Sequence, residues 1–227
     1  MRLSISPSSN SQPSRRSALF GLPALGVALG LLLMGGGSCI AAEPAFAGTE
    51  LRDSFPAQGD EGIQPELLGG WEYFAEKDGA QLVEHPFVWT SHNPEVWPEG
   101  RLTAGSAYIQ PDARYDDALT VVPGNHESNA VLQWTAPADG NFNLDGWFQK
   151  LQKTPTLAQE TEGVELIIRG PSGNELQKFT SGIEDTEVKT FSIKLPNMKA
   201  GETVAFVVRG ITVNWGNETR LSARITK

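Results

Sequence analysis

The chain has 227 residues, enough for one or two domains, and its formal charge is −9 at pH 7. The charged residues of positions 1–47, three arginines and Glu43, contribute +2, so the rest of the chain carries −11. A body this acidic repels phosphate backbones and contains no basic patch, which argues against nucleic-acid binding. Its acidity fits the solubility of an exported domain.

The one cysteine, Cys39, lies near the N-terminus, so no disulfide can form within the chain. The rest of the chain has no thiol, which excludes thiolate catalysis and cysteine metal sites there. Gly and Pro are frequent, with 24 and 15 residues and no fixed period, which favours many short strands joined by turns.

Residues 1–47 are predicted to be an export segment outside the fold. The pair Arg15-Arg16 precedes a charge-free run, Ser17–Ala42, and together they resemble a twin-arginine export signal. An ordinary secretory signal peptide is an equal alternative, because any positively charged start would serve it. Ala45-Phe46-Ala47 follows the small-x-small rule and predicts cleavage before Gly48.

Two alternatives would keep the protein associated with a membrane. Gly36-Gly37-Ser38-Cys39 loosely resembles a lipobox, which makes Cys39 a candidate for lipidation. The run Ala18–Met34 is nearly long enough to remain as an anchor, since a membrane span needs about 17–25 residues. These alternatives, like a cleaved signal, place the body in the periplasm or on the extracytoplasmic face of a membrane. A plastid-type transit peptide is a further alternative.

Residues 48–70 are polar, with prolines and several glycines, and are predicted to be a linker with one short strand near its end. A long loop is expected over Ser91–Gly105. Period-two alternation and aromatic or β-branched runs predict the strands that follow. They are Trp71–Phe74, Phe87–Thr90, Tyr108–Gln110, Ala118–Val122, Val131–Trp134, Phe142–Phe148, Val164–Arg169, Glu175–Thr180, Val188–Leu195, Thr203–Val208 and Leu221–Thr226.

The stretch Val131–Phe148 is the strongest structural signal in the chain. Two apolar runs flank Ala136–Gly140, where proline presets φ and Asp-Gly supplies a left-handed corner. The interpretation is two strands joined by a short corner, with Trp134 and Trp147 in the core. Strands that recur about every ten residues, without a helical stretch, predict an all-β antiparallel sandwich over residues 71–227.

Several segments also resemble a module of exported bacterial proteins. Val131–Pro137 and Gly140–Gly146 are similar to its "WTAP…G" strand pair, Lys199–Phe206 to its "aGDtVdF" strand, and Leu221–Thr226 to its closing strand. The resemblance covers about Trp71–Thr226. It implies a jelly-roll-like β-sandwich similar to carbohydrate-binding modules, and it implies a fold rather than an activity.

No arrangement of residues predicts catalysis. The histidines His85, His92 and His126 are isolated, and the sequence has neither an HExxH nor a GxSxG motif. Carboxylate pairs occur by chance in any acidic protein, so they carry little weight for glycoside hydrolysis. The protein is therefore predicted not to be an enzyme, and a glycan hydrolase or lyase is kept as a third hypothesis that nothing in the sequence positively supports.

A structural calcium is the one cofactor hypothesis that the sequence offers. Asp112, Asp116 and Asp117 lie in one expected loop and could, with backbone carbonyls, ligate Ca²⁺. No D-x-D-x-D-G loop is present, and the alternative is that these are solvated loop acids. No other cofactor is expected.

The tryptophans are the main candidates for ligand binding, because an indole stacks on the apolar face of a pyranose ring. Trp97 and Trp215 stand in polar, turn-rich sequence and are expected to be exposed, and Trp89 is a third candidate. The alternative is that they cover the edge of the sandwich.

The leading hypothesis is an exported non-catalytic module that binds carbohydrate or another envelope component. The alternative is an accessory subunit of a membrane-bound envelope complex, docked on its extracytoplasmic face and tethered through the N-terminus.

Overall fold

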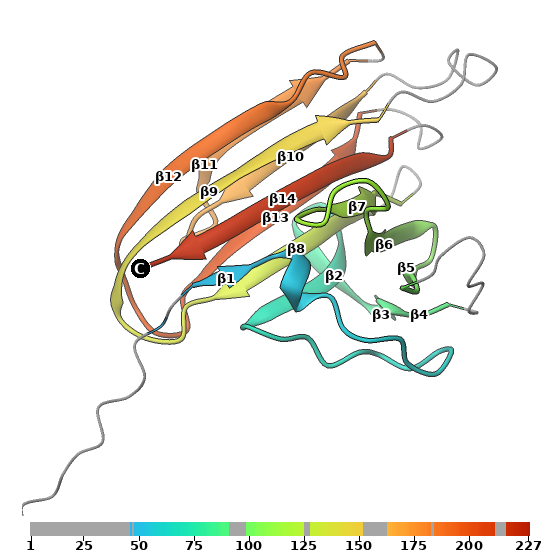
Figure 1. Ribbon diagram of the computed structural model, residues 1–227, viewed down its shortest axis with the longest axis horizontal. Helices are drawn as coiled ribbons and strands as arrows, with labels where there is room; N and C mark the ends of the chain where they lie inside the picture. The colour runs from blue at the N-terminus through green and yellow to red at the C-terminus, as the bar shows by residue number, and fades with distance from the viewer. Residues whose placement is uncertain are drawn as a thin grey trace, which may run out of the picture. The chain divides into compact units, whose positions relative to one another are not determined.

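The computed structural model describes residues 46, 48–90, 99–124, 128–151, 163–182, 184–211 and 217–227. Two antiparallel sheets make up most of this part of the chain (Figure 1). Sheet A has the order β12 (Lys189–Met198), β9 (Gly140–Lys150), β14 (Thr219–Thr226), β7 (Leu119–Val122), β6 (Ala107–Pro111), β5 (Leu102–Ala104) and β4 (Val88–Trp89), and β1 (Thr49–Glu50) also pairs with β14. Sheet B has the order β11 (Glu175–Ser181), β10 (Val164–Arg169), β13 (Thr203–Gly210), β8 (Asn129–Thr135), β2 (Trp71–Lys77) and β3 (Ala80–Pro86).

The chain passes back and forth between the two sheets. From β7 to β14, every connection except the β10–β11 hairpin joins a strand of one sheet to a strand of the other. This alternation gives the sandwich its jelly-roll-like character, and it confirms the all-β fold class expected from the sequence. The two sheets can therefore bury one shared core between them.

The core lies between the inward faces of the sheets. Trp134 of β8 is fully buried, and its indole meets the Phe142 ring edge-on, with the ring centroids 5.1 Å apart. Phe206 of β13 stacks against Trp71 of β2 at 5.9 Å. Burial of each large apolar side chain contributes about 1.5–3 kcal/mol, so these residues dominate the stability of the sandwich.

The corner between β8 and β9 has the role expected of it, because β8 lies in sheet B and β9 in sheet A. Backbone bonds hold the corner to the turn before β13: Ala136 N–H donates to Glu202 O at 2.8 Å, and Gly201 N–H donates to Ala136 O at 2.9 Å. Asp139 accepts a bond from the Ala200 N–H at 2.9 Å. Hydrogen bonds to the turn before β13 therefore fix the position of the corner in the fold.

The segment 48–70, expected as a linker, instead packs onto the sandwich. Leu51 is fully buried, and its N–H donates to Ala223 O at 2.8 Å. A 3-10 turn, η1 (Arg52–Ser54), leads to Phe55, whose ring meets Trp89 edge-on at 5.7 Å. The few apolar residues here have no regular period, which is why the sequence pattern indicated a linker.

Phe46 extends this packing in the N-terminal direction. Its ring centroid lies 6.0 Å from that of Trp134 and 5.8 Å from that of Phe142. A chain cut before Gly48 would lack this ring, so the expected cleavage position would remove an aromatic contact from the edge of the core. The other residues of the predicted export segment, including Cys39, lie outside the described residues.

Three strands were not anticipated: β1, which lies at the start of the expected linker instead of near its end, β3 and β5. β3 is almost wholly exposed, with Val83 at 76% exposure, so it shows no alternation of apolar and polar residues. β5 lies within the expected loop Ser91–Gly105 and is only three residues long. Among the residues that the structure describes, no helix has the length and apolar character needed to cross a membrane.

The outer face of sheet B carries a second apolar cluster, formed by Val131, Ile167, Ala205 and Val207 with Phe74 against them. Long charged side chains flank the cluster. The Arg169 guanidinium bonds both carboxylate oxygens of Glu76, the longer contact being 2.9 Å, and Glu165 contacts Lys178 Nζ at 2.6 Å. Glu165 also pairs with Arg209.

Candidate polar cleft on the outer face of sheet A

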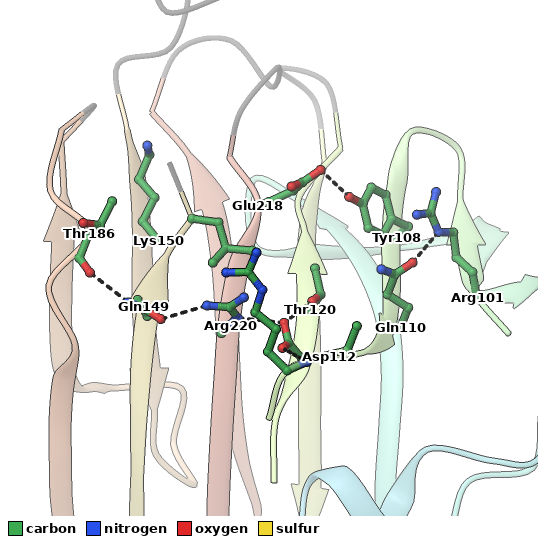
Figure 2. A pocket seen from close by; sticks show the side chains of 13 residues that line it. Arg101, Tyr108, Gln110, Asp112, Thr120, Gln149, Lys150, Thr186, Glu218 and Arg220 are labelled. Atoms are coloured by element: carbon green, nitrogen blue, oxygen red, sulfur yellow. Dashed lines mark hydrogen bonds and ion pairs between the residues drawn. The ribbon is translucent and has the colours of Figure 1, made fainter. Parts of the chain in front are cut away.

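A cleft of about 590 Å³ opens on sheet A, on the side away from the core (Figure 2). Phe148, Leu221 and Ile109 point into the core and are fully buried, so the residues next to them in each strand face outward. Pairing sets Arg220 of β14 opposite both Gln149 of β9 and Thr120 of β7.

The same pairing continues across the sheet, because Thr120 stands opposite Gln110 of β6. Gln149, Arg220, Thr120 and Gln110 therefore form one row across four adjacent strands, which we call the polar row. All four residues line the cleft.

A buried ion pair lies at the centre of the cleft. Arg220 Nε donates to Asp112 Oδ2 at 2.8 Å, and both side chains are less than 10% exposed. Thr120 Oγ1 donates to the same oxygen at 2.8 Å, and the Arg114 N–H donates to Oδ1 at 2.9 Å. Burial alone raises the pKa of the Asp112 carboxyl, but the hydrogen bonds from Arg220, the Arg114 N–H and Thr120 hold it below its usual value.

These contacts bear on the calcium hypothesis. Asp112 is turned toward Arg220, whereas Asp117 accepts bonds from Trp147 Nε1 at 3.1 Å and Ser222 Oγ at 3.0 Å. Asp116 is exposed. The three aspartates are not brought together, and no group of three or more His, Cys, Asp or Glu among the described residues is placed to hold a metal ion.

One wall of the cleft is formed by Tyr108 and Arg101. Tyr108 Oη donates to Glu218 Oε1 at 2.7 Å, and Arg101 Nε donates to Gln110 Oε1 at 2.7 Å. The Arg101 guanidinium lies over the Tyr108 ring, 4.0 Å from its centroid. Burial, and then the nearby Glu218 charge, raise the pKa of Tyr108, so the phenol remains a neutral hydrogen-bond donor.

The opposite end of the cleft lies at the end of β9. Gln149 Nε2 donates to the Thr186 carbonyl at 3.0 Å, while Arg220 Nη1 donates to Gln149 Oε1 at 3.2 Å. These bonds are drawn in Figure 2 and fix the Gln149 amide from two sides. Lys150, the last residue of β9, also lines the cleft and is buried, which lowers the pKa of its ammonium.

An aromatic pair borders the cleft. Tyr115 is 42% exposed, the Arg220 guanidinium lies 4.8 Å from its ring centroid, and its ring meets Trp147 edge-on at 5.3 Å. Trp147 was expected in the core, but it faces outward. The alternation of β9 places its neighbour Phe148 inside, and two adjacent strand residues cannot both point to one face.

The structure tests only one of the three tryptophans that were expected to bind a ligand. Trp89 is 2% exposed and packs against Phe55, so its indole has no open face for a sugar, which corrects its assignment as a ligand-binding residue. Trp134 is buried in the core, as expected. Trp97 and Trp215 lie outside the described residues.

The polar row was missed by sequence reasoning. Each member is an ordinary outward-facing residue of its own strand, and nothing in its local sequence marks it as part of a site. Only the pairing of β9, β14, β7 and β6 reveals that these side chains lie next to one another.

Comparisons with known proteins find similar structures but no matching sequence. No protein-family model and no curated protein matches the chain. Among solved structures, the chain is similar to the C-terminal CBM6 of LamC, a marine laminarinase from Zobellia galactanivorans, with 13% identity, 54% of this chain and 90% of that chain covered, and a TM-score of 0.32. A family 35 carbohydrate-binding module from Clostridium thermocellum shares 18% identity over 53% of this chain and 87% of its own, with a TM-score of 0.31.

A third similar structure is the K3 cleaved adhesin domain of Lys-gingipain from Porphyromonas gingivalis W83, with 16% identity, 68% and 91% of the two chains covered, and a TM-score of 0.37. The sandwich of this chain is established by its own strand pairing. At such identities and TM-scores, the likeness carries no argument about what this chain binds.

Proposed function

We propose that the protein is an exported, non-catalytic module that binds carbohydrate in the cleft on the outer face of sheet A. The observation that carries the proposal is the polar row beside the Tyr108 wall, in a cleft of about 590 Å³. This volume lies within the range of about 300–1,000 Å³ that is usual for small-ligand sites.

The chemistry of the lining suits sugar hydroxyls. Gln110, Gln149 and Arg220 carry planar groups that donate or accept pairs of hydrogen bonds. Each is held by a neighbour: Gln110 by Arg101, and Gln149 and Arg220 by one another. Side chains fixed in this way lose little conformational freedom when a ligand binds, which favours affinity.

Two tyrosine rings lie in or next to the cleft. Tyr108 forms part of the wall, and the exposed Tyr115 borders the cleft through its contact with Arg220. The apolar face of a pyranose ring packs against such rings. Trp215, three residues before Glu218 in the chain, remains a candidate for the same role.

The state of the carboxylates supports binding rather than hydrolysis. Glycoside hydrolysis requires one carboxyl with a raised pKa to act as the acid. The pKa of Asp112 is instead held low by its bonds to Arg220, the Arg114 N–H and Thr120. Glu218 accepts the Tyr108 hydroxyl. Export is inferred from the arginine pair Arg15-Arg16 and the charge-free run that follows it.

The proposal is tested by isothermal titration of the protein with a panel of soluble oligosaccharides. Tyr108→Ala and Gln149→Ala are expected to weaken binding on the order of tenfold each, as expected for the loss of about 1.4 kcal/mol. The matched control is Lys194→Ala, an exposed residue of β12 in the same sheet that does not line the cleft. Absence of binding to every saccharide, with co-purification of a membrane complex, would contradict the proposal and favour the accessory-subunit alternative.

A further inference from the structure

The residue just before the expected cleavage position is packed into the sandwich. The ring centroid of Phe46 lies 6.0 Å from that of Trp134 and 5.8 Å from that of Phe142, and these two core rings also meet one another edge-on. The compact unit that contains the sandwich extends from Pro44 to Lys227. The fold therefore includes a residue that the motif Ala45-Phe46-Ala47 assigned to the export segment.

Gly48, on the other side of the expected cut, is also fixed in place. Its φ of +122° is a backbone conformation that residues other than glycine rarely adopt. A Cβ at this position would lie 2.9 Å from the Ile225 carbonyl oxygen and 3.3 Å from Thr226 Cγ2. The last strand of the sandwich, β14, therefore lies directly against the residue that the expected cut would turn into the new N-terminus.

The residues that follow Gly48 are held by the same strand. Thr49 and Glu50 form β1, which pairs antiparallel with β14. Leu51 is fully buried, and its N–H donates to Ala223 O at 2.8 Å. These contacts tie the segment after the expected cut to the sandwich through both backbone hydrogen bonds and apolar burial.

A segment held in this way is closed to a peptidase in the folded protein. Peptidases take up their substrates as extended stretches of several residues, and a backbone that is buried or hydrogen-bonded has to unfold locally first. A cut before Gly48 would require both Phe46 and β1 to leave the sandwich. The twin-arginine route, which the pair Arg15-Arg16 resembles, carries folded proteins, so a peptidase on that route meets the folded chain.

A second small-x-small triplet lies farther from the fold. Cys39-Ile40-Ala41 has small residues at its first and third positions, and it lies at the end of the charge-free run. Four residues, 42–45, separate a cut after Ala41 from Phe46, and an extended chain of that length spans about 13 Å. This length gives a peptidase access to the bond while Phe46 stays packed against the core.

We propose that the export segment is removed between Ala41 and Ala42, so that the mature protein keeps Phe46 as part of its core. The step is the hydrolysis of one peptide bond by an export peptidase. One water molecule is consumed, Ala41 gains the new carboxylate, and Ala42 gains the new amino group. This inference goes beyond ligand binding and rests only on the export that is part of the proposed function.

Thermal unfolding of the mature protein tests whether Phe46 is retained. The full chain is produced in a bacterial host with its own N-terminal segment, and the mature protein is purified from the periplasm. Phe46→Ala should lower the unfolding temperature by about 4–8 °C, because it removes a partly buried ring from the core. Val83→Ala, which shortens a side chain that is 76% exposed, is the matched control and should change the temperature by less than about 2 °C.

Intact mass spectrometry of the same samples locates the cut. The mature mass is expected to correspond to residues 42–227. Ala41→Gln places a large side chain directly before the proposed cut and should abolish the species that begins at Ala42. Ala47→Gln makes the same change directly before Gly48 and should leave the position of the cut unchanged.

The possible contrary results are distinct. A mature protein that begins at Gly48 would overturn the inference and leave export and ligand binding intact. Its unfolding temperature would then be the same in Phe46→Ala, because the mature proteins would be identical. A lipid-bearing Cys39 at the N-terminus would overturn the position of the cut. A chain that stays uncut in every fraction would overturn both the inference and the export on which it rests.

Discussion

The outer faces of the two sheets use similar charged residues for different ends. On sheet B, Glu76 and Glu165 pair with arginines and a lysine beside an apolar cluster that includes Val131 and Val207. On sheet A, Arg220 pairs with Asp112, and the polar row beside it lines a cleft of about 590 Å³. The hollow beside the sheet B ion pairs, at about 390 Å³, is smaller.

The two outer faces differ in the residues that lie next to their charged side chains. Val131 and Val207 face one another across β8 and β13, and they are buried although they lie on the outside of the sandwich. The aliphatic stems of arginine and lysine cover such apolar surface well. On sheet A, the facing residues are polar and bond to one another along the row, which leaves a hollow lined with hydrogen-bonding groups. On sheet B the ion pairs flank apolar side chains and shield them from water. On sheet A the ion pair holds polar side chains that line the cleft.

The largest expected effect comes from breaking the ion pair at the centre of the cleft. Arg220→Ala should lower the free energy of unfolding by about 3–5 kcal/mol, because Asp112 is left as a buried, unpaired charge. Urea denaturation measures the change. In the double variant Asp112→Ala with Arg220→Ala the loss should be less than the sum of the single losses, since the two residues share one interaction. If Arg220→Ala lowered the free energy of unfolding by less than about 1 kcal/mol, the buried ion pair would not be a main source of stability.

A smaller effect is expected on sheet B. Arg169→Ala leaves the buried Glu76 carboxylate without its guanidinium partner and should lower the free energy of unfolding by about 2 kcal/mol. Saccharide affinity should not change, which would sharpen the contrast between the two faces. Lys199→Ala, which removes the exposed pair with Asp139, is the control and should leave the free energy of unfolding almost unchanged. A loss of saccharide binding in Arg169→Ala would break the comparison.

The smallest effect concerns acid stability, to which both faces contribute. Burial raises the pKa values of Asp112 and Glu165, but the hydrogen bonds that each carboxyl accepts outweigh it and hold the values below the ordinary 3.8 and 4.5. The unfolded chain therefore binds more protons in this range, so stability is fully present above about pH 5 and falls as the pH drops through the folded pKa values.

Thermal unfolding between pH 7 and pH 3 tests this expectation on each face separately. Asp112→Asn and Glu165→Gln should each flatten the decline of the unfolding temperature at low pH, while lowering stability at pH 7. An unchanged pH profile in either variant would show that its carboxyl does not contribute to acid stability.

Much of the fold follows from local patterns. The alternation of Phe142, Leu144 and Phe148 with polar residues predicts β9 and its buried face, and Asp139-Gly140 predicts the corner before it. The sequence pattern did not predict structure in segments whose apolar residues have no regular period. Leu51 and Phe55 pack onto the sandwich from an irregular segment, and β3 is too exposed to alternate.

The sequence by itself determined most of the strands and the inward face of those that alternate regularly, because the two-residue period of a strand is a local property. Only the tertiary structure decided that Arg220 meets Asp112, 108 residues away, and Gln149, 71 residues away. Strand order and register set those meetings, and they depend on how the two sheets close over their shared core. The cleft exists only once four strands from separate parts of the chain lie side by side.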